Sequence, residues 1–410
     1  MNYIAVIILF AMIVEVMTNG LADFLNLKMA GNDLPEAFSG MCDEDQYQKS
    51  QEYLRVNTGF SWIVSVVSLS ITLLFWFGKW FPYLDNWTRS WGRGPVLTGL
   101  MYIGILIFFK VLLSLPFSIY STFVIEERFG FNKTGWVTFI IDRVKGFVLA
   151  MLIGVPLLAG VLGFFIYAGS NAWWYCWIVV TVFILAIQYI APMWIMPLFN
   201  KFEPMAEGEL KDAVMAYAES IQFPLKNVFV MDGSKRSSKA NAFFTGFGKN
   251  RRIVLFDTLI EQHSVEELVA ILAHEMGHYK KKHILKMMAI GVLQTGIVFF
   301  LLSLFISRQE LFDAFYMEYK SVHAGLIFFG MLYAPIDLFV GLFLQYFSRK
   351  NEYEADRFAA KTTGNPNAMS ESLKKLSVRN LTNLTPHPLY VFLNYSHPPV
   401  LERIRAIHSH

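Results

Sequence analysis

The sequence of 410 residues is poor in cysteine and in charged side chains. Its two cysteines, Cys42 and Cys176, lie far apart in dissimilar surroundings, which excludes a cysteine-based metal site. We expect both to be ordinary buried thiols. Charged residues make up 16% of the chain and hydrophobic residues 55%, so there is too little polar surface to cover a soluble globule of this length. The composition therefore predicts a protein embedded in a lipid bilayer.

The charge balance also excludes one class of partner. The net charge is only +3, and the basic residues form no patch interleaved with aromatic side chains. Proteins that bind nucleic acid use such a basic footprint to neutralise phosphate groups. We therefore expect no nucleic-acid partner.

Seven apolar stretches are each long enough to cross a bilayer, which takes about 20 helical residues. They cover residues 3–22, 60–78, 97–118, 147–168, 172–192, 287–306 and 323–346. No basic segment precedes the first stretch and no clear cleavage site follows it, so we interpret it as a retained helix and not as a signal peptide. The sequence predicts a mainly α-helical, multi-pass membrane protein with seven transmembrane helices.

The distribution of basic residues predicts how the chain is oriented. Residues 193–286, between the fifth and sixth stretches, contain 13 Lys and Arg, whereas residues 307–322 contain two. Loops rich in Lys and Arg tend to stay in the cytoplasm. We expect residues 193–286 and the C-terminal segment to be cytoplasmic, and the N-terminus to lie outside.

The alternation of apolar and polar regions divides the chain into four parts. Residues 1–192 hold the first five spans, 193–286 form a polar region, 287–346 hold the last two spans, and 347–410 form a second polar region. Within the first polar region, residues 228–231 are a short β-type run. Residues 240–247 and 253–256 flank a polar, glycine-containing turn at 248–252, which is typical of a hairpin. We expect a small β-sheet here.

A helix follows the predicted sheet. Ser264 is a good N-cap, and Glu267 three residues later completes a capping box. No proline interrupts the chain from there through Lys286. We expect one helix over residues 264–286 that continues into the sixth span.

That helix carries His274, Glu275 and His278. Residues four apart lie on one helical face, so both imidazoles can bind one ion. Glu275 is turned about 100° from His274, which places its carboxylate beside the metal's water and not on the metal. Two histidine ligands and a glutamate base at this spacing are typical of zinc hydrolases. We predict one zinc ion per chain.

A catalytic zinc needs a third protein ligand and an open position. Glu352 and Asp356 share a helical face just beyond the seventh span. One of them can bind the metal while the other accepts a hydrogen bond from a ligand imidazole. The spacing does not choose between them. Glu354 points elsewhere, and we expect it to be solvated.

The sequence resembles the integral-membrane CAAX prenyl endopeptidases, which are zinc proteases of the gluzincin type. The resemblance covers nearly the whole chain and extends well beyond the zinc-binding helix. Its further motifs are residues 126–133 (EERFGFNK), 197–202 (PLFNKF), 238–246 (SKANAFFTG), 252–259 (RIVLFDTL), 352–356 (EYEAD), 396–399 (SHPP) and 402–404 (ERI). The resemblance implies seven spans that enclose a large chamber.

The resemblance also implies roles for individual residues. It implies Glu352 as the third zinc ligand and Asp356 as the partner of a ligand histidine. It brings Asn241 and His397 to the active site, where they would bind the substrate backbone or the developing oxyanion. These two residue types can donate hydrogen bonds of the kind that an oxyanion site uses. We expect Arg403 to pair with a nearby carboxylate and to hold the tail in place.

The expected reaction is zinc-assisted peptide hydrolysis with Glu275 as the general base. An extended peptide or protein substrate would add to the edge of the 240–247 strand through backbone hydrogen bonds. The resemblance implies removal of the C-terminal tripeptide from prenylated CAAX substrates, with the prenyl group as one source of recognition.

Two other functions compete with this prediction. A general quality-control protease for membrane proteins would share the zinc site without requiring a prenyl group. A transporter with a structural zinc is the remote alternative, and Glu275 argues against it because a structural site needs no base. Short loops and the absence of an endoplasmic-reticulum retention tail favour a bacterial inner membrane as the location, with the endoplasmic reticulum expected for a eukaryotic chain.

Overall fold

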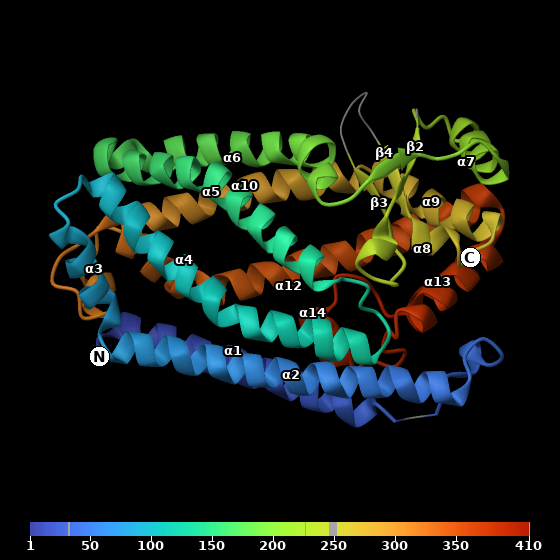
Figure 1. Ribbon diagram of the computed structural model, residues 1–410, viewed down its shortest axis with the longest axis horizontal. Coiled ribbons are helices and arrows are strands. Elements are labelled where there is room, and N and C mark those ends of the chain that lie inside the picture. Colours follow the sequence, from blue (N-terminus) through green and yellow to red (C-terminus); the bar gives the residue numbers. More distant parts are fainter. Residues whose placement is uncertain (32, 226, 246–251, 410) are drawn as a thin grey trace.

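The computed structural model describes residues 1–31, 33–225, 227–245 and 252–409. Long helices lie side by side along the longest dimension of the molecule (Figure 1). The strands and several short helices gather at one end, where the C-terminus also lies. The N-terminus lies at the opposite end, as an odd number of membrane crossings requires.

Seven helices in the described chain are long and apolar enough to cross a membrane, which confirms the predicted number. They are α1 (Tyr3–Met29), α2 (Glu44–Phe77), α4 (Pro95–Tyr120) with its π-helical continuation η2 (Ser121–Glu126), α5 (Trp136–Tyr167), α6 (Ala172–Ile190) with its π-helical continuation η4 (Ala191–Ile195), α10 (His283–Phe305) and α12 (Val322–Thr363). Large apolar side chains such as Phe108, Leu152 and Phe339 are exposed on these helices. A bilayer would cover such side chains.

Short elements connect the spans. They are η1 (Glu36–Phe38), α3 (Trp80–Ser90), η3 (Gly169–Asn171), η5 (Met196–Leu198) and α11 (Gln309–Asp313). At the end of the molecule farthest from the sheet, Asp85 of α3 pairs with His323 of α12, and both side chains are buried. Both cysteines are buried free thiols, as expected.

The remaining elements form the polar end of the molecule. They are β1 (Phe202–Pro204), α7 (Glu209–Ser220), β2 (Val228–Met231), η6 (Gly233–Lys235), β3 (Ala242–Thr245), β4 (Arg252–Phe256), α8 (Asp257–Ile260), α9 (Val265–Lys280), α13 (Pro366–Arg379), α14 (Pro388–Asn394) and α15 (Val400–His408). Their apolar side chains make one core, in which β4, α9 and α13 all take part.

The four described strands form one mixed sheet in the order β1-β2-β4-β3. β3 pairs antiparallel with β4, so the expected hairpin partners do meet, and β2 runs parallel to β4. Residues 246–251, which include the end of the predicted strand and most of the predicted turn, lie outside the described residues. β3 is the last strand of the described sheet, and its far edge has no described partner strand.

The helix expected over residues 264–286 is divided in two. The capping box of Ser264 and Glu267 starts α9 as predicted. However, α9 ends at Lys280 and α10 begins at His283. Lys282 lies between them in a left-handed backbone conformation, with φ of 58°. The prediction of one continuous helix was wrong, because a single residue in this conformation is enough to end the helical hydrogen-bond ladder.

α12 runs for 42 residues and continues well past the predicted end of the seventh span at residue 346. Its extension packs against α9 at Gly277. A Cβ atom at this glycine would lie 3.3 Å from both the Cα and the carbonyl oxygen of Ala355. A side chain here would therefore push the two helices apart, and the close approach brings the polar residues of α12 up to the histidines of α9.

Candidate active site

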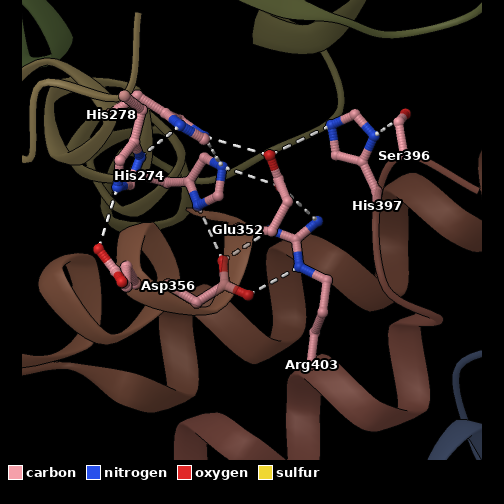
Figure 2. Close-up of polar contacts among 9 residues, drawn as sticks. His274, His278, Glu352, Asp356, Ser396, His397 and Arg403 are labelled. Atoms are coloured by element: carbon pink, nitrogen blue, oxygen red, sulfur yellow. Dashed lines mark hydrogen bonds and ion pairs between the residues drawn. The ribbon is translucent and has the colours of Figure 1, made fainter. Parts of the chain in front are cut away.

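Two imidazoles of α9 form the centre of a buried polar cluster (Figure 2). His274 and His278 lie one helical turn apart, so their side chains project from the same face. The two Nε2 atoms are 3.1 Å apart. The predicted convergence of the two histidines is therefore present.

Glu352 of α12 completes this group from the opposite side. Its Oε2 lies 3.4 Å from His274 Nε2, and its Oε1 lies 3.3 Å from His278 Nε2. Glu352 is 3% exposed, and within the described chain Oε2 receives no hydrogen bond. One ligand atom from each of the three residues could bind a common metal ion.

The three separations suit a tetrahedral ion. Bonds of about 2.0–2.1 Å at tetrahedral angles place neighbouring ligand atoms about 3.3 Å apart. The edges of the cluster measure 3.1, 3.3 and 3.4 Å. Two imidazole nitrogens and one carboxylate oxygen are also the donor set that zinc takes in hydrolytic sites. The residues present therefore fit a zinc ion.

Asp356 lies behind the cluster and contacts only one of the two imidazoles. Its Oδ1 is 2.8 Å from His274 Nδ1. Arg403 of α15 donates to both of its carboxylate oxygens, at 2.7 and 2.6 Å, so Arg403 pairs with a carboxylate as expected. This arrangement leaves His274 Nε2 facing Glu352. Among the described contacts of these two carboxylates, Glu352 reaches both Nε2 atoms, whereas Asp356 reaches His274 Nδ1.

His397 approaches from the segment between α14 and α15. Its Nε2 lies 3.4 Å from Glu352 Oε1, and its Nδ1 lies 3.0 Å from the hydroxyl of Ser396. The side chain is 62% exposed, in contrast to the buried cluster. His397 therefore stands at the rim of the site, with most of its side chain exposed.

Glu275 is half-buried on α9, next to His274. Burial raises the pKa of its carboxyl group, while the neighbouring His274 and His278 act to lower it. The charge of Glu352 also raises this pKa, and the charge of Arg403 lowers it.

Asn241 is the predicted site residue that the structure does not join to the cluster. Its side-chain oxygen accepts a hydrogen bond from the backbone of Ala242, and no described contact links it to the histidines or to Glu352. It is exposed and stands at the start of β3. β3 itself lies close to α9: the ring centroids of Phe244 in β3 and Tyr279 in α9 are 5.9 Å apart.

Two polar residues next to the cluster were missed or misjudged. Glu354 was expected to be solvated, but its Oε2 lies 3.1 Å from His283 Nε2. The Nδ1 atom of His283 in turn lies 3.1 Å from the Nδ1 atom of His278. His283 is five residues after His278, a spacing that would not bring them together in one helix, so only the break at Lys282 could have indicated this contact.

Two cavities flank the cluster. The larger, of about 740 Å³, lies between α6, α10 and α12 and is lined by Leu185, Gln188, His278, Met287 and Asn351 among others. The smaller, of about 350 Å³, is lined partly by Asn380, Tyr395, His397 and Arg403. One cavity therefore reaches His278, and the other reaches His397 and Arg403.

Two family models match consecutive parts of the chain. The model described as CAAX prenyl protease N-terminal, five membrane helices, matches residues 23–201. The model of peptidase family M48 matches residues 204–410. Together they extend over nearly the whole chain, as the sequence motifs do.

Similar proteins are known from distant eukaryotes. CAAX prenyl protease 1 of Saccharomyces cerevisiae is 34% identical, with 93% of this chain and 89% of the relative aligned. The CAAX prenyl protease 1 homologs of Arabidopsis thaliana and Homo sapiens are 36% and 34% identical, with 91% of this chain and 90% and 88% of the relatives aligned.

The fold has a solved counterpart. The crystal structure of S. mikatae Ste24p superposes with a TM-score of 0.91 at 32% identity, and the match covers 99% of each chain. The prediction of a hydrolase is confirmed, and the alternative of a transporter is set aside. With seven apolar helices, a possible metal-binding group and these relatives, the chain belongs to peptidase family M48 as a membrane metalloendopeptidase of the CAAX prenyl protease type.

Proposed function

We propose that this chain is a zinc endopeptidase that removes the C-terminal tripeptide from prenylated CAAX substrates. One zinc ion per chain would be held by His274, His278 and Glu352. The observation that carries the metal assignment is the convergence of two Nε2 atoms and one buried carboxylate at 3.1–3.4 Å. The substrate class follows the names of the relatives, each of which is a CAAX prenyl protease 1 or its homolog.

Zinc at this position would polarise the scissile carbonyl and increase the acidity of water. The protein must supply a group that accepts a proton from the attacking water and returns it to the leaving amine. Glu275 is suited to this because burial raises the pKa of its carboxyl group, which strengthens it as a base and later allows it to act as an acid.

His397 and Asn241 would bind the substrate. His397 stands at the rim, 3.4 Å from Glu352, and its exposed ring can donate a hydrogen bond to a substrate carbonyl or to the oxyanion that forms from it. Asn241 stands at the start of β3, whose far edge is open among the described strands. An extended peptide can add to this edge through backbone hydrogen bonds and then pass in front of α9.

Asp356 and Arg403 would orient one of the ligands. The carboxylate of Asp356, 2.8 Å from His274 Nδ1, would keep the lone pair of Nε2 directed at the metal position. Arg403 compensates the buried charge of Asp356 through two hydrogen bonds. Neither residue needs to touch the substrate.

The larger cavity supports recognition of an apolar group. It reaches His278, and it is lined by side chains of three membrane helices, among them Leu185, Met287 and Met288. A prenyl chain attached close to the scissile bond could occupy such a space. A quality-control protease without this requirement remains the second candidate, because it would use the same zinc site.

The products of one defined peptide test the proposal. A prenylated peptide that ends in a CAAX sequence and its unprenylated twin are incubated with purified protein, and the products are identified by mass. We expect release of the terminal tripeptide from the prenylated form only, and release at least about 100-fold slower with Glu275→Gln. Equal cleavage of both peptides would favour the quality-control protease.

We also propose the orientation and the division of labour within the chain. Residues 1–192 and 287–346 would form the membrane part, while 193–286 and 347–410 would together form a cytoplasmic catalytic part. The 13 basic residues in 193–286 support this orientation. Protection of a C-terminal tag from added protease in sealed vesicles tests it. Membrane fractionation tests the location, for which a bacterial inner membrane, or the endoplasmic reticulum in a eukaryote, stays the prediction.

A further inference from the structure

Three polar groups form a continuous line from the surface to the metal site. Glu354 Oε2 lies 3.1 Å from His283 Nε2, and His283 Nδ1 lies 3.1 Å from His278 Nδ1. Both separations are within hydrogen-bond range. His283 is 2% exposed, whereas the side chain of Glu354 is 35% exposed. The line therefore begins at a carboxylate in contact with solvent and ends on a residue assigned as a metal ligand.

The hydrogen-bond chemistry of these groups fixes the protons along the line. A carboxylate can only accept, so His283 Nε2 carries a hydrogen. In the neutral ring, Nδ1 of His283 then has a free lone pair and accepts from His278 Nδ1–H. This leaves His278 Nε2 unprotonated. It is the nitrogen that faces His274 Nε2 and Glu352 Oε1, at 3.1 and 3.3 Å.

The broken helix makes this contact possible. In a continuous helix, positions 278 and 283 would project about 140° apart. The left-handed residue Lys282, with φ of 58°, ends α9 and lets α10 start in a new direction at His283. The side chain of His283 can then reach back to His278. The local backbone is thus arranged for an interaction that regular helical geometry does not provide.

His274, the other proposed ligand histidine, has the same orientation, but a different residue contacts its Nδ1 atom. His274 Nδ1 lies 2.8 Å from the carboxylate of Asp356, and its Nε2 also faces the cluster. Both imidazoles thus have Nδ1 engaged and Nε2 directed inward. His274 meets its carboxylate directly, whereas a second imidazole stands between His278 and its carboxylate.

We propose that His283 and Glu354 are positioning residues that hold His278 in the tautomer and ring orientation that bind zinc. This inference rests on one part of the proposed function, namely that His278 is a zinc ligand. Partners of this kind change metal affinity by about 10- to 100-fold when they are removed. Neither residue touches the substrate in this account.

The test measures zinc affinity in the purified full-length protein by competition with a chromogenic chelator. We expect His283→Ala and Glu354→Ala to bind zinc at least about tenfold more weakly than the wild type. Glu354→Gln keeps an acceptor oxygen for His283 Nε2–H and should lie between the wild type and Glu354→Ala. Because Glu354 acts through His283, the double variant should be no weaker than His283→Ala alone.

A matched control comes from the other buried histidine–carboxylate pair. His323 pairs with Asp85 at the far end of α12, so His323→Ala removes a comparable buried interaction without reaching the site. It should keep wild-type zinc affinity. The melting temperatures of the zinc-free proteins show whether each variant is folded. If His283→Ala does not fold, the half-exposed Glu354→Ala decides the question.

The possible failures are distinguishable. A wild-type protein that takes up no zinc contradicts the proposed function. Stoichiometric zinc in the wild type together with unchanged affinity in His283→Ala or Glu354→Ala overturns the positioning role and leaves the proposed function intact.

Discussion

The guanidinium of Arg403 donates hydrogen bonds to both carboxylate oxygens of Asp356, and it also lies 3.7 Å from Glu352. One cation of α15 thus pairs with two buried carboxylates of α12. The tail of the chain is thus tied to α12, the helix that carries Glu352, the proposed third ligand.

Loss of this cation is expected to destabilise the protein. Arg403→Ala leaves the buried Asp356 without its cationic partner, a change that typically costs about 3–5 kcal/mol. Thermal unfolding in detergent measures the effect. Arg405 is on the same helix but exposed, so Arg405→Ala is the matched control and should change stability by less than about 0.5 kcal/mol. Equal melting temperatures for the two variants would contradict this reading of the pair.

Replacing the proposed base should separate catalysis from metal binding. Glu275→Gln removes the proton acceptor but none of the three groups that would hold zinc, so we expect activity to fall by about 10²–10⁴-fold with zinc content unchanged. Metal analysis and single-turnover cleavage of one peptide check both parts. A fully active variant would show that another group takes the proton.

The two carboxylates of α12 should differ in their effect on zinc. Glu352→Ala removes a ligand atom, and we expect it to lose stoichiometric zinc. Asp356→Ala removes only the partner of His274, and we expect about 10- to 100-fold weaker binding. Zinc content after dialysis against a weak chelator distinguishes them. Stoichiometric zinc in Glu352→Ala would assign the third ligand to a different residue.

The left-handed residue between α9 and α10 offers a test of the backbone. A non-glycine residue in this conformation is strained by about 1–2 kcal/mol, and glycine removes this strain. The greater freedom of glycine in the unfolded chain offsets part of that gain. We expect Lys282→Gly to raise stability by about 0.5–1 kcal/mol. Lys281, with φ of −83°, has an ordinary backbone, so Lys281→Gly should lower stability by a similar amount. Opposite signs in thermal unfolding are the expected result.

Removal of metal should affect stability as well as activity. An ion bound only by the folded state stabilises it, so treatment with a strong chelator should lower the melting temperature and abolish cleavage, and added zinc should restore both. Glu352→Ala provides the control. Without this zinc-binding side chain the protein is not stabilised by zinc, so the chelator should not lower its melting temperature. An equal fall in melting temperature in that variant would indicate a different zinc site.

Much of the architecture could be predicted because it follows from local signals. Apolar length gave all seven spans, and Ser264 with Glu267 gave the start of α9. The convergence of His274 and His278 follows from a spacing of four residues on one helix. In each case the decisive interactions lie within one turn or one continuous segment.

What could not be predicted depends on the packing of distant segments. Glu352 and Asp356 share a helical face, so spacing could not assign them, and only the approach of α12 to α9 distinguishes their contacts. The break at Lys282 was missed because lysine has no preference for a left-handed backbone. The contact between His283 and Glu354 depends on that break, and it was missed for the same reason.

The placement of Glu352 on α12 also bears on how the enzyme comes into being. The two histidines leave the ribosome before α10, and Glu352, the proposed third ligand, follows only after α10 and most of α12. A partly synthesised chain therefore has an incomplete metal site. If Glu352 is that ligand, proteolytic activity would arise only once α10 and α12 have packed against α9, and a chain still being synthesised would be inactive.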